Sequence, residues 1–252
     1  MWKHNKNVMM YWLTGAVVST LWVSPVQAQE DFAGLEKDPL VFYGLSFEQF
    51  EYRVGDDDDD DVLAWDGDAF VGTDEWKLRL QSEGEYIKGP DVFETLENQL
   101  LVQRLVSDFF DIKAGVRFDT PDGPDRTYAV IGIQGLAPQW FEVDADLFIS
   151  EKGDVSARLD VDYELLITNR IILTPTAEFT IAFSDDEDIG IGSGLTDIEL
   201  GLRLSYDLIE RDVAPYIGMH YERKFGKTAD FAEAGGEDSD ELFFVAGVRL
   251  LF

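Results

Sequence analysis

The feature that most constrains this chain is a long series of segments in which apolar and polar residues alternate one by one. From residue 42 to residue 252 these segments are about ten to fourteen residues long, with clusters of Gly, Pro, Asp and Asn between them. Clear examples are residues 76–81, 141–147 and 155–165. Side chains on a β-strand point alternately to opposite faces, so each segment predicts a strand with one apolar and one charged face.

The alternation predicts about twelve strands, an even number, as in bacterial single-chain barrels. They are expected at residues 42–54, 61–71, 75–88, 94–107, 109–120, 126–137, 140–150, 154–168, 170–183, 196–209, 213–226 and 241–252. Each is long enough for the roughly nine to eleven tilted residues that cross a bilayer. The predicted connections alternate between short turns and longer loops, the longest being 184–195 and 227–240. This alternation of short and long connections is expected if both chain ends lie in the periplasm.

A soluble β-sandwich would also alternate, but it buries its apolar faces between two sheets and uses shorter strands. The sequence ends on Leu250, Leu251 and Phe252 without a polar tail. Outer-membrane proteins resemble one another in ending a strand on an aromatic residue. The predicted fold class is therefore all-β: a transmembrane antiparallel up-and-down β-barrel of about 12 strands in the outer membrane of a Gram-negative bacterium.

The N-terminal residues have the pattern of a secretory signal. Lys3 and Lys6 precede an uncharged, mostly apolar stretch at 8–23, and residues 26–28 fit a small-residue cleavage site. A transmembrane helix is the alternative, but the stretch is shorter than the roughly 20 residues that span a bilayer. The predicted division is a signal peptide at 1–28, a short periplasmic segment at 29–41 and an outer-membrane barrel at 42–252.

The composition excludes several classes of function. A net charge of −31 argues against a nucleic-acid partner, which would need clustered Lys and Arg. The chain has no cysteine, which excludes disulfides, thiolate metal sites and Cys nucleophiles. Once His4 is lost with the signal, His220 is the one histidine left, and no recognisable serine motif accompanies it. We therefore predict no catalytic residues and no enzyme; the alternative, a lipid-modifying barrel enzyme, would have His220 as its base.

The charged faces of the predicted strands point into the barrel. The inward residues are expected to be Lys77, Arg79, Glu83, Glu85, Lys113, Arg117, Glu142, Asp144, Asp146, Arg158, Asp160, Asp162, Glu164, Glu178, Glu199, Arg203, Asp207, Glu222 and Arg249. In a structural interpretation these charges pair between strands and fill a narrow interior. In a functional one, the excess of acids attracts cations into a pore or cavity.

His220 and Glu222 share the predicted luminal face, whereas Met219 faces lipid. They are the candidate metal residues, although a lone histidine is more often an ordinary packed residue. The six aspartates at 56–61 predict a solvated loop, with a gathering of divalent cations as the alternative.

Several blocks of the sequence, in the same order, are similar to the copper-resistance protein B family of outer-membrane proteins. These blocks are residues 63–67, 135–142, 165–170, 190–195, 214–218 and 221–230. The resemblance covers roughly residues 42–252. It implies an outer-membrane barrel in copper resistance that binds or passes copper ions, with periplasmic partners that include a multicopper oxidase. The alternative is a general cation-preferring porin or a structural barrel.

The chain departs from this family in one respect. Many members carry a Met- and His-rich segment between signal and barrel, which suits both oxidation states of copper. Residues 29–41 contain neither Met nor His. Copper contacts are therefore expected at His220, Glu222 and other luminal carboxylates, which would form weak and poorly selective sites.

Overall fold

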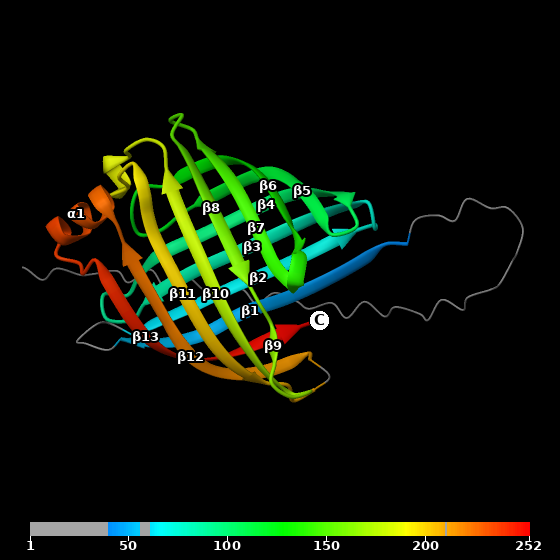
Figure 1. Ribbon diagram of the computed structural model, residues 1–252. Helices are drawn as coiled ribbons and strands as arrows, with labels where there is room; N and C mark the ends of the chain where they lie inside the picture. Colours follow the sequence, from blue (N-terminus) through cyan, green and yellow to red (C-terminus); the bar gives the residue numbers. More distant parts are fainter. Residues whose placement is uncertain (1–39, 56–60, 210) are drawn as a thin grey trace, which may run out of the picture. The chain divides into compact units, whose positions relative to one another are not determined.

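The computed structural model describes residues 40–55, 61–209 and 211–252. The predicted signal peptide, nearly all of segment 29–41 and Asp56 to Asp60 lie outside the described residues. Most described residues belong to strands (Figure 1). The elements are β1 Phe42–Gly55, β2 Val62–Gly72, β3 Trp76–Ile87, β4 Val92–Ser107, β5 Phe110–Asp119, β6 Arg126–Ala137, η1 Pro138–Trp140, β7 Phe141–Ser150, β8 Val155–Asp162, β9 Leu165–Leu166, β10 Ile171–Ala182, η2 Glu187–Ile189, β11 Gly194–Tyr206, β12 Val213–Lys224, α1 Gly226–Gly235 and β13 Asp240–Leu251.

The strands form one closed antiparallel sheet. Each strand pairs with the next along the chain, and β13 pairs back with β1. The short β9 pairs with β10 beyond the end of β8, so β8 and β9 are two parts of one interrupted strand. The result is a closed barrel of twelve strands, which confirms the predicted fold class and excludes the sandwich.

The interruption between β8 and β9 corrects the continuous strand predicted at 154–168. Asp162 is paired with Thr176 and Leu165 with Leu173, which leaves Tyr163 and Glu164 between them outside the strands. Pro175 lies opposite this gap, and its ring nitrogen has no hydrogen to donate to the neighbouring strand. All other predicted strand ends lie within three residues of the observed ones.

Burial in this barrel is the reverse of that in a soluble protein. Apolar side chains such as Leu80 and Ile131 are exposed on the outer face. Charged side chains such as Lys113, Arg203 and Glu51 are buried in the interior. An apolar outer face around a charged lumen is the arrangement of a barrel that lipid surrounds. Within the described ranges, no helix combines the length and hydropathy needed for a membrane crossing.

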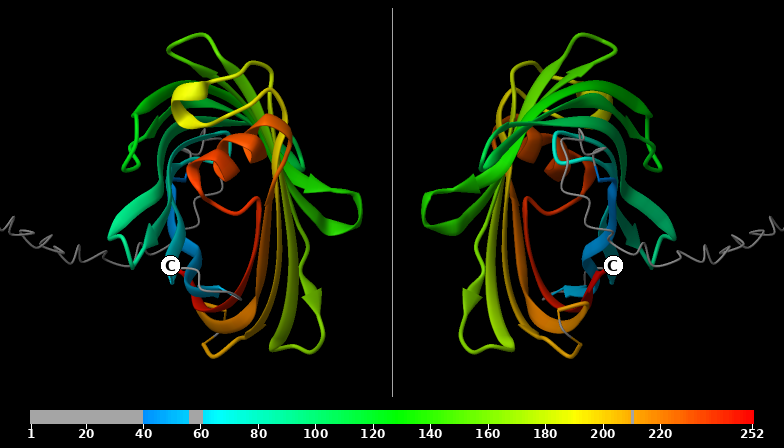
Figure 2. Two further views of the ribbon diagram at one scale, coloured as in Figure 1. Left: turned by 90° about the vertical axis from the view of Figure 1, so that its left-hand side faces the viewer. Right: turned by 90° about the vertical axis from the view of Figure 1, so that its right-hand side faces the viewer.

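The two ends of the barrel differ, as the connection lengths predicted. The short turns lie at the end that holds the chain terminus, where Phe252 pairs with Leu45. The longest connections lie at the opposite end, and one of them contains α1, a helix that the sequence analysis did not predict (Figure 1). Viewed from that end, α1 lies across part of the barrel opening (Figure 2). It is held there by a hydrogen bond of 3.0 Å from the Gly192 amide to the Thr228 hydroxyl.

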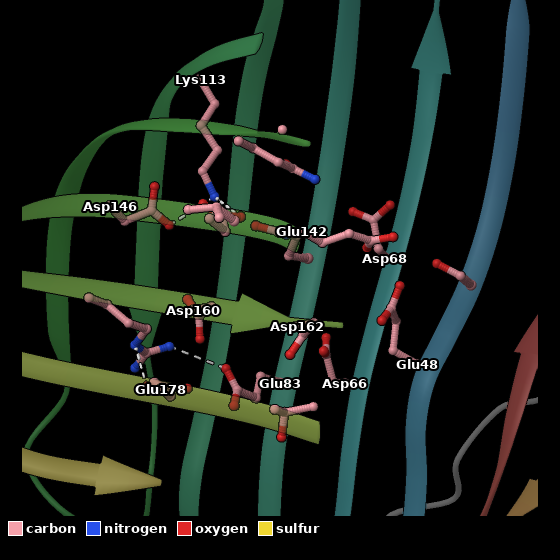
Figure 3. Close-up of a pocket in the computed structure, with 18 of the residues that line it drawn as sticks. Glu48, Asp66, Asp68, Glu83, Lys113, Glu142, Asp146, Asp160, Asp162 and Glu178 are labelled. Atoms are coloured by element: carbon pink, nitrogen blue, oxygen red, sulfur yellow. Dashed lines mark hydrogen bonds and ion pairs between the residues drawn. The ribbon is translucent and has the colours of Figure 1, made fainter. Parts of the chain in front are cut away.

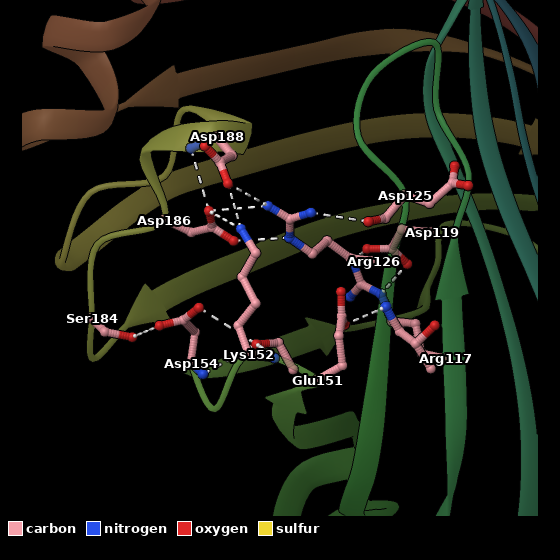
Figure 4. A network of polar contacts seen from close by, with 12 residues as sticks. Arg117, Asp119, Asp125, Arg126, Glu151, Lys152, Asp154, Ser184, Asp186 and Asp188 are labelled. Carbon is pink, nitrogen blue, oxygen red and sulfur yellow. Dashed lines mark hydrogen bonds and ion pairs between the residues drawn. The ribbon is translucent and has the colours of Figure 1, made fainter.

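Ion pairs connect the loops at the α1 end. Arg126 donates two hydrogen bonds to the carboxylate of Asp186, at 2.9 and 3.1 Å, and Lys152 bridges Asp186 and Asp188 (Figure 4). Hydrogen bonding to Arg126 keeps the pKa of Asp186 below its usual range. The loops before β6, after β7 and after β10 are thereby joined into one cap at this end of the barrel.

Candidate functional site in the barrel lumen

The lumen contains a cavity of about 710 Å³ lined mostly by charged side chains (Figure 3). Among the described residues that line it, fourteen carboxylates face six lysines and arginines. The carboxylates are Glu48, Asp66, Asp68, Glu83, Glu97, Asp108, Asp111, Glu142, Asp144, Asp146, Asp160, Asp162, Glu178 and Glu199. Low-dielectric walls of one charge sign raise the local concentration of counter-ions, here cations.

Many of the luminal charges are paired, as the structural interpretation expected. The ammonium of Lys113 lies 2.7 Å from Asp144 and 2.8 Å from Asp146. The guanidinium of Arg203 donates two hydrogen bonds of 2.8 Å to Glu51. Pairing of this kind fixes the walls, but the excess of acids over bases in the cavity remains.

The most unusual feature of the lumen is a row of carboxylates in direct register across neighbouring strands, here called the carboxylate ladder. Its members, in order around the barrel, are Asp144, Asp160, Glu178, Glu199, Glu222 and Glu241. Each lies directly opposite the next on the adjacent strand. Like charges directly opposite one another destabilise a sheet, so cations beside the ladder would stabilise it.

The ladder extends from one end of the barrel toward the other. Strand pairs in an antiparallel sheet lie perpendicular to the strands, and barrel strands tilt by about 35–45°, so a row of pairs climbs along the barrel axis. Asp144 lies near the start of β7, just after a short turn, whereas Glu241 lies near the start of β13, just after α1. The backbones of neighbouring members are therefore about one strand spacing apart, roughly 4.8 Å, along the whole ladder.

A candidate metal site lies beside the middle of the ladder. Carboxylate oxygens of Glu178, Asp197 and Glu199 lie within 4.8 Å of one another. The Nε2 atom of His220 is 3.5 Å from Glu199, and the imidazole is 5% exposed. Neither ring nitrogen of His220 has a hydrogen-bond partner in the described part of the chain. A buried polar group without a partner costs about 1–3 kcal/mol, so an imidazole left in this state indicates a place for a ligand.

The structure places the predicted site residues as follows. His220 lines the cavity, as expected, and Met219 is 43% exposed on the outer face. Glu222 lies two residues after His220 on β12, in the direction of α1. It is paired with Glu199 and does not line the cavity. Histidine is thus brought closest to Glu199, and the assignment of a metal to His220 and Glu222 stays a prediction.

Sequence reasoning placed Glu178 and Glu199 in the lumen but missed their clustering with Asp197, and it did not find that Glu48 and Glu51 face inward. The cluster of Glu178, Asp197 and Glu199 depends on the pairing of β10 with β11, which alternation alone does not give. Glu48 and Glu51 both face inward although their spacing is odd, because a bulge between Phe47 and Gln49 shifts the alternation of β1. The available signal for the ladder was one acidic residue at an inward position of each of five successive predicted strands: Asp144, Asp160, Glu178, Glu199 and Glu222.

A closed barrel of twelve strands, with lipid-facing apolar side chains and a charged lumen, defines this chain as an outer-membrane β-barrel protein. The family model for the copper resistance protein B precursor matches residues 41–252. The chain belongs to the copper resistance protein B family.

Two relatives support this assignment. Copper resistance protein B of Escherichia coli is 40% identical over 215 residues, covering 85% of this chain and 71% of that protein. A copper resistance protein B homolog of Pseudomonas syringae pv. tomato is 42% identical over 197 residues, covering 78% of this chain and 66% of the relative. The chain thus spans about two thirds of the length of these relatives.

Solved structures with similar folds are much more distant in sequence. A membrane protein from a study of in-meso crystallization is 12% identical with a TM-score of 0.50, covering 84% of this chain and 83% of that one. The NanC porin is 14% identical with a TM-score of 0.49, covering 83% of this chain and 99% of the porin. At this identity the likeness concerns the fold alone.

Proposed function

We propose that this barrel passes copper ions across the outer membrane along the carboxylate ladder, with a transient binding site at His220. The ladder is the observation that carries the proposal, because six acids in register from one end of the lumen toward the other have a folding cost that cation passage would explain. Membership of the copper resistance protein B family supports copper as the cargo.

The donor atoms favour Cu(II) over Cu(I). Imidazole nitrogen suits copper, and carboxylate oxygen suits harder divalent ions, whereas Cu(I) prefers thioether and thiolate sulfur. His220 and Glu199 offer nitrogen and oxygen 3.5 Å apart, a separation that one ion can bridge with bonds of about 2.0–2.2 Å, as zinc does. Glu222, the neighbouring member of the ladder, would take the ion next. Met219, the one methionine in the described residues, faces outward instead.

Weak binding is what passage requires. An ion must bind well enough to enter and loosely enough to leave, with several sites in succession. One histidine among carboxylates provides such a site. We propose no catalytic step, since the ring nitrogens of His220 have no hydrogen-bond partner in the described residues that would serve as a nucleophile.

The orientation that fits this function puts α1 and the long loops outside the cell and both termini in the periplasm. Residues 1–28 would be removed as a signal peptide, residues 29–41 would form a short periplasmic segment, and 42–252 would form the barrel. Copper leaving the lumen at the terminus end would then reach periplasmic partners, among them a multicopper oxidase.

Titration of the purified barrel with Cu(II) in detergent tests the site. His220→Ala should weaken the tightest Cu(II) binding at least tenfold and remove the nitrogen hyperfine signal in electron paramagnetic resonance. Glu199→Gln and Glu222→Gln should weaken binding less, because each removes one of several oxygen ligands. Met219→Leu is the matched control, since it changes the adjacent residue on the lipid face and should leave binding unchanged.

Transport is tested in liposomes that contain a copper-sensitive dye. The intact barrel should admit Cu(II), and Glu178→Gln combined with Glu199→Gln should slow its entry at least tenfold. Equal entry by the intact barrel and this double variant would contradict a route along the ladder. Equal passage of Cu(II), Mg²⁺ and K⁺ would instead identify a general cation-preferring porin.

A further inference from the structure

One luminal arginine connects opposite walls of the barrel. Arg158 projects from β8, and its guanidinium donates hydrogen bonds of 3.1 and 3.0 Å to Glu97 on β4 and one of 3.3 Å to Glu83 on β3. Strand β3 is five places away from β8 in the ring of twelve, so it lies almost diametrically opposite. Glu83 and Glu97 face each other directly across β3 and β4, which gives the arginine a two-carboxylate acceptor.

The cavity ends at the level of this bridge. Arg158, Glu83 and Glu97 all line it. The next inward residues toward α1 on two of these strands, Ser156 on β8 and Glu85 on β3, do not. The same boundary occurs on β12 and β11, where the lining includes His220 and Glu199 and excludes their neighbours closer to α1.

Packed apolar side chains adjoin the bridge on one wall of the lumen. Phe148, Leu101 and Val130 form a cluster of inward-facing apolar residues with 2% exposure or less. The guanidinium of Arg158 lies 5.7 Å from the centre of the Phe148 ring, and the guanidinium of Arg117 lies 4.7 Å from the centre of the same ring. Arg117 also contacts Glu97, so the acceptor of the bridge is held in place.

The bridge shares one carboxylate with the candidate metal site. The Nε atom of Arg158 lies 2.9 Å from Glu178, as an ion pair without hydrogen-bond alignment. Glu178 also belongs to the cluster with Asp197 and Glu199. A divalent cation in that cluster would compete with Arg158 for Glu178 and place a second positive charge near the guanidinium.

We propose that Arg158 closes the lumen to free ion flow, and that a divalent cation bound beside Glu178 opens it by drawing Glu178 away and repelling the guanidinium. This regulation rests on the proposed function, because the opening cation is its cargo. The barrel would then pass copper while remaining closed to the abundant monovalent ions.

Conductance of the complete barrel in planar lipid bilayers, in KCl with and without Cu(II), tests this proposal. In metal-free KCl, Arg158→Ser should raise the conductance at least about threefold, since it removes the constriction. Lys113→Ser is the matched control: it removes one buried luminal positive charge, but Lys113 pairs with Asp144 and Asp146 on one wall of the barrel. Its conductance should stay within about twofold of the intact protein, because the change in luminal charge is the same but no bridge is lost.

Cu(II) should raise the conductance of the intact barrel toward that of Arg158→Ser and should not raise that of Glu178→Gln. Arg158→Lys keeps the charge but lacks the planar fork that reaches several carboxylates, so it should also conduct more; it replaces Arg158→Ser if that variant does not fold.

Equal conductance of Arg158→Ser and Lys113→Ser would overturn the closure. Cu(II) binding in calorimetry without a change in conductance would overturn the opening mechanism and leave the copper site intact. Absence of Cu(II) binding would overturn the proposed function and the opening step together, whereas the metal-free comparison would still decide whether Arg158 closes the lumen.

Discussion

Neutralising one buried glutamate should destabilise the whole barrel. The side chain of Glu51 has no exposed surface and accepts four hydrogen bonds: two of 2.8 Å from Arg203, one of 2.8 Å from Arg53 and one of 2.9 Å from the Tyr216 hydroxyl. The side chains of both arginines are 7% exposed. Glu51→Gln removes the negative charge that both share and places an amide N–H group against donors. Among the described residues, Arg203 then has no carboxylate within ion-pair distance, and Arg53 keeps only Glu85.

The expected loss follows from these contacts. A hydrogen bond to a charged group contributes about 1.5–3 kcal/mol, and removal of one partner of a buried ion pair costs about 3–5 kcal/mol. We therefore expect Glu51→Gln to lower the free energy of unfolding by about 3–5 kcal/mol, a large fraction of the roughly 5–15 kcal/mol of a typical protein. Glycine at position 247 leaves the space this cluster needs, since a Cβ there would collide with the Tyr216 ring.

Urea-dependent unfolding and refolding in lipid vesicles, followed by tryptophan fluorescence, measures this loss. Glu164→Gln is the matched control, because Glu164 pairs with Arg249 and Arg211 while its side chain is 33% exposed. Because solvent screens this exposed pair, Glu164→Gln should lower the free energy of unfolding by only about 0–1 kcal/mol. If Glu51→Gln lowered the free energy of unfolding no more than Glu164→Gln, water would have to solvate the two guanidinium groups. The inference that these ion pairs are shielded from water would then be wrong.

Two further predictions concern the outer face and the loop cap. Ile131 is 60% exposed near the middle of β6, so Ile131→Arg should cost about 2–4 kcal/mol in vesicle unfolding, whereas Val106→Arg near the short-turn end of β4 should cost about 0–1; similar losses at both positions would contradict the placement of the lipid belt. Hydrogen bonds from Lys227 and Arg126 lower the pKa values of Asp185 and Asp186, respectively, in the cap. A carboxyl group whose pKa is lowered by folding stabilises the folded cap at pH values above 3.8, the usual Asp pKa. This stabilisation is lost as the pH falls through the pKa of the folded state. Hydrogen exchange of the α1 amides, corrected for intrinsic rates, should therefore be constant from pH 8 to pH 5 and rise only below 3.8; a rise between pH 8 and pH 5 would point to other groups as the holders of the cap.

Much of the fold was determined by the sequence itself. The period of two is a local property of the β backbone, so alternation along each segment was enough to locate the strands and to choose their inward faces. Connection lengths were enough to separate the two ends of the barrel. The position of His220 on the luminal face followed from the same rule, and so did the outward direction of Met219.

Register and closure were decided only by the tertiary structure. Alternation states which face a carboxylate occupies but not which residue stands opposite it, and the carboxylate ladder exists only because of the pairing of β7 through β13. Contacts across the lumen, such as those of Arg158 with Glu83 and Glu97, depend on how the closed sheet brings strands distant in sequence together. The bulge in β1, the gap opposite Pro175 and the helix α1 also depend on these long-range contacts, since each is a departure from local periodicity that the rest of the barrel stabilises.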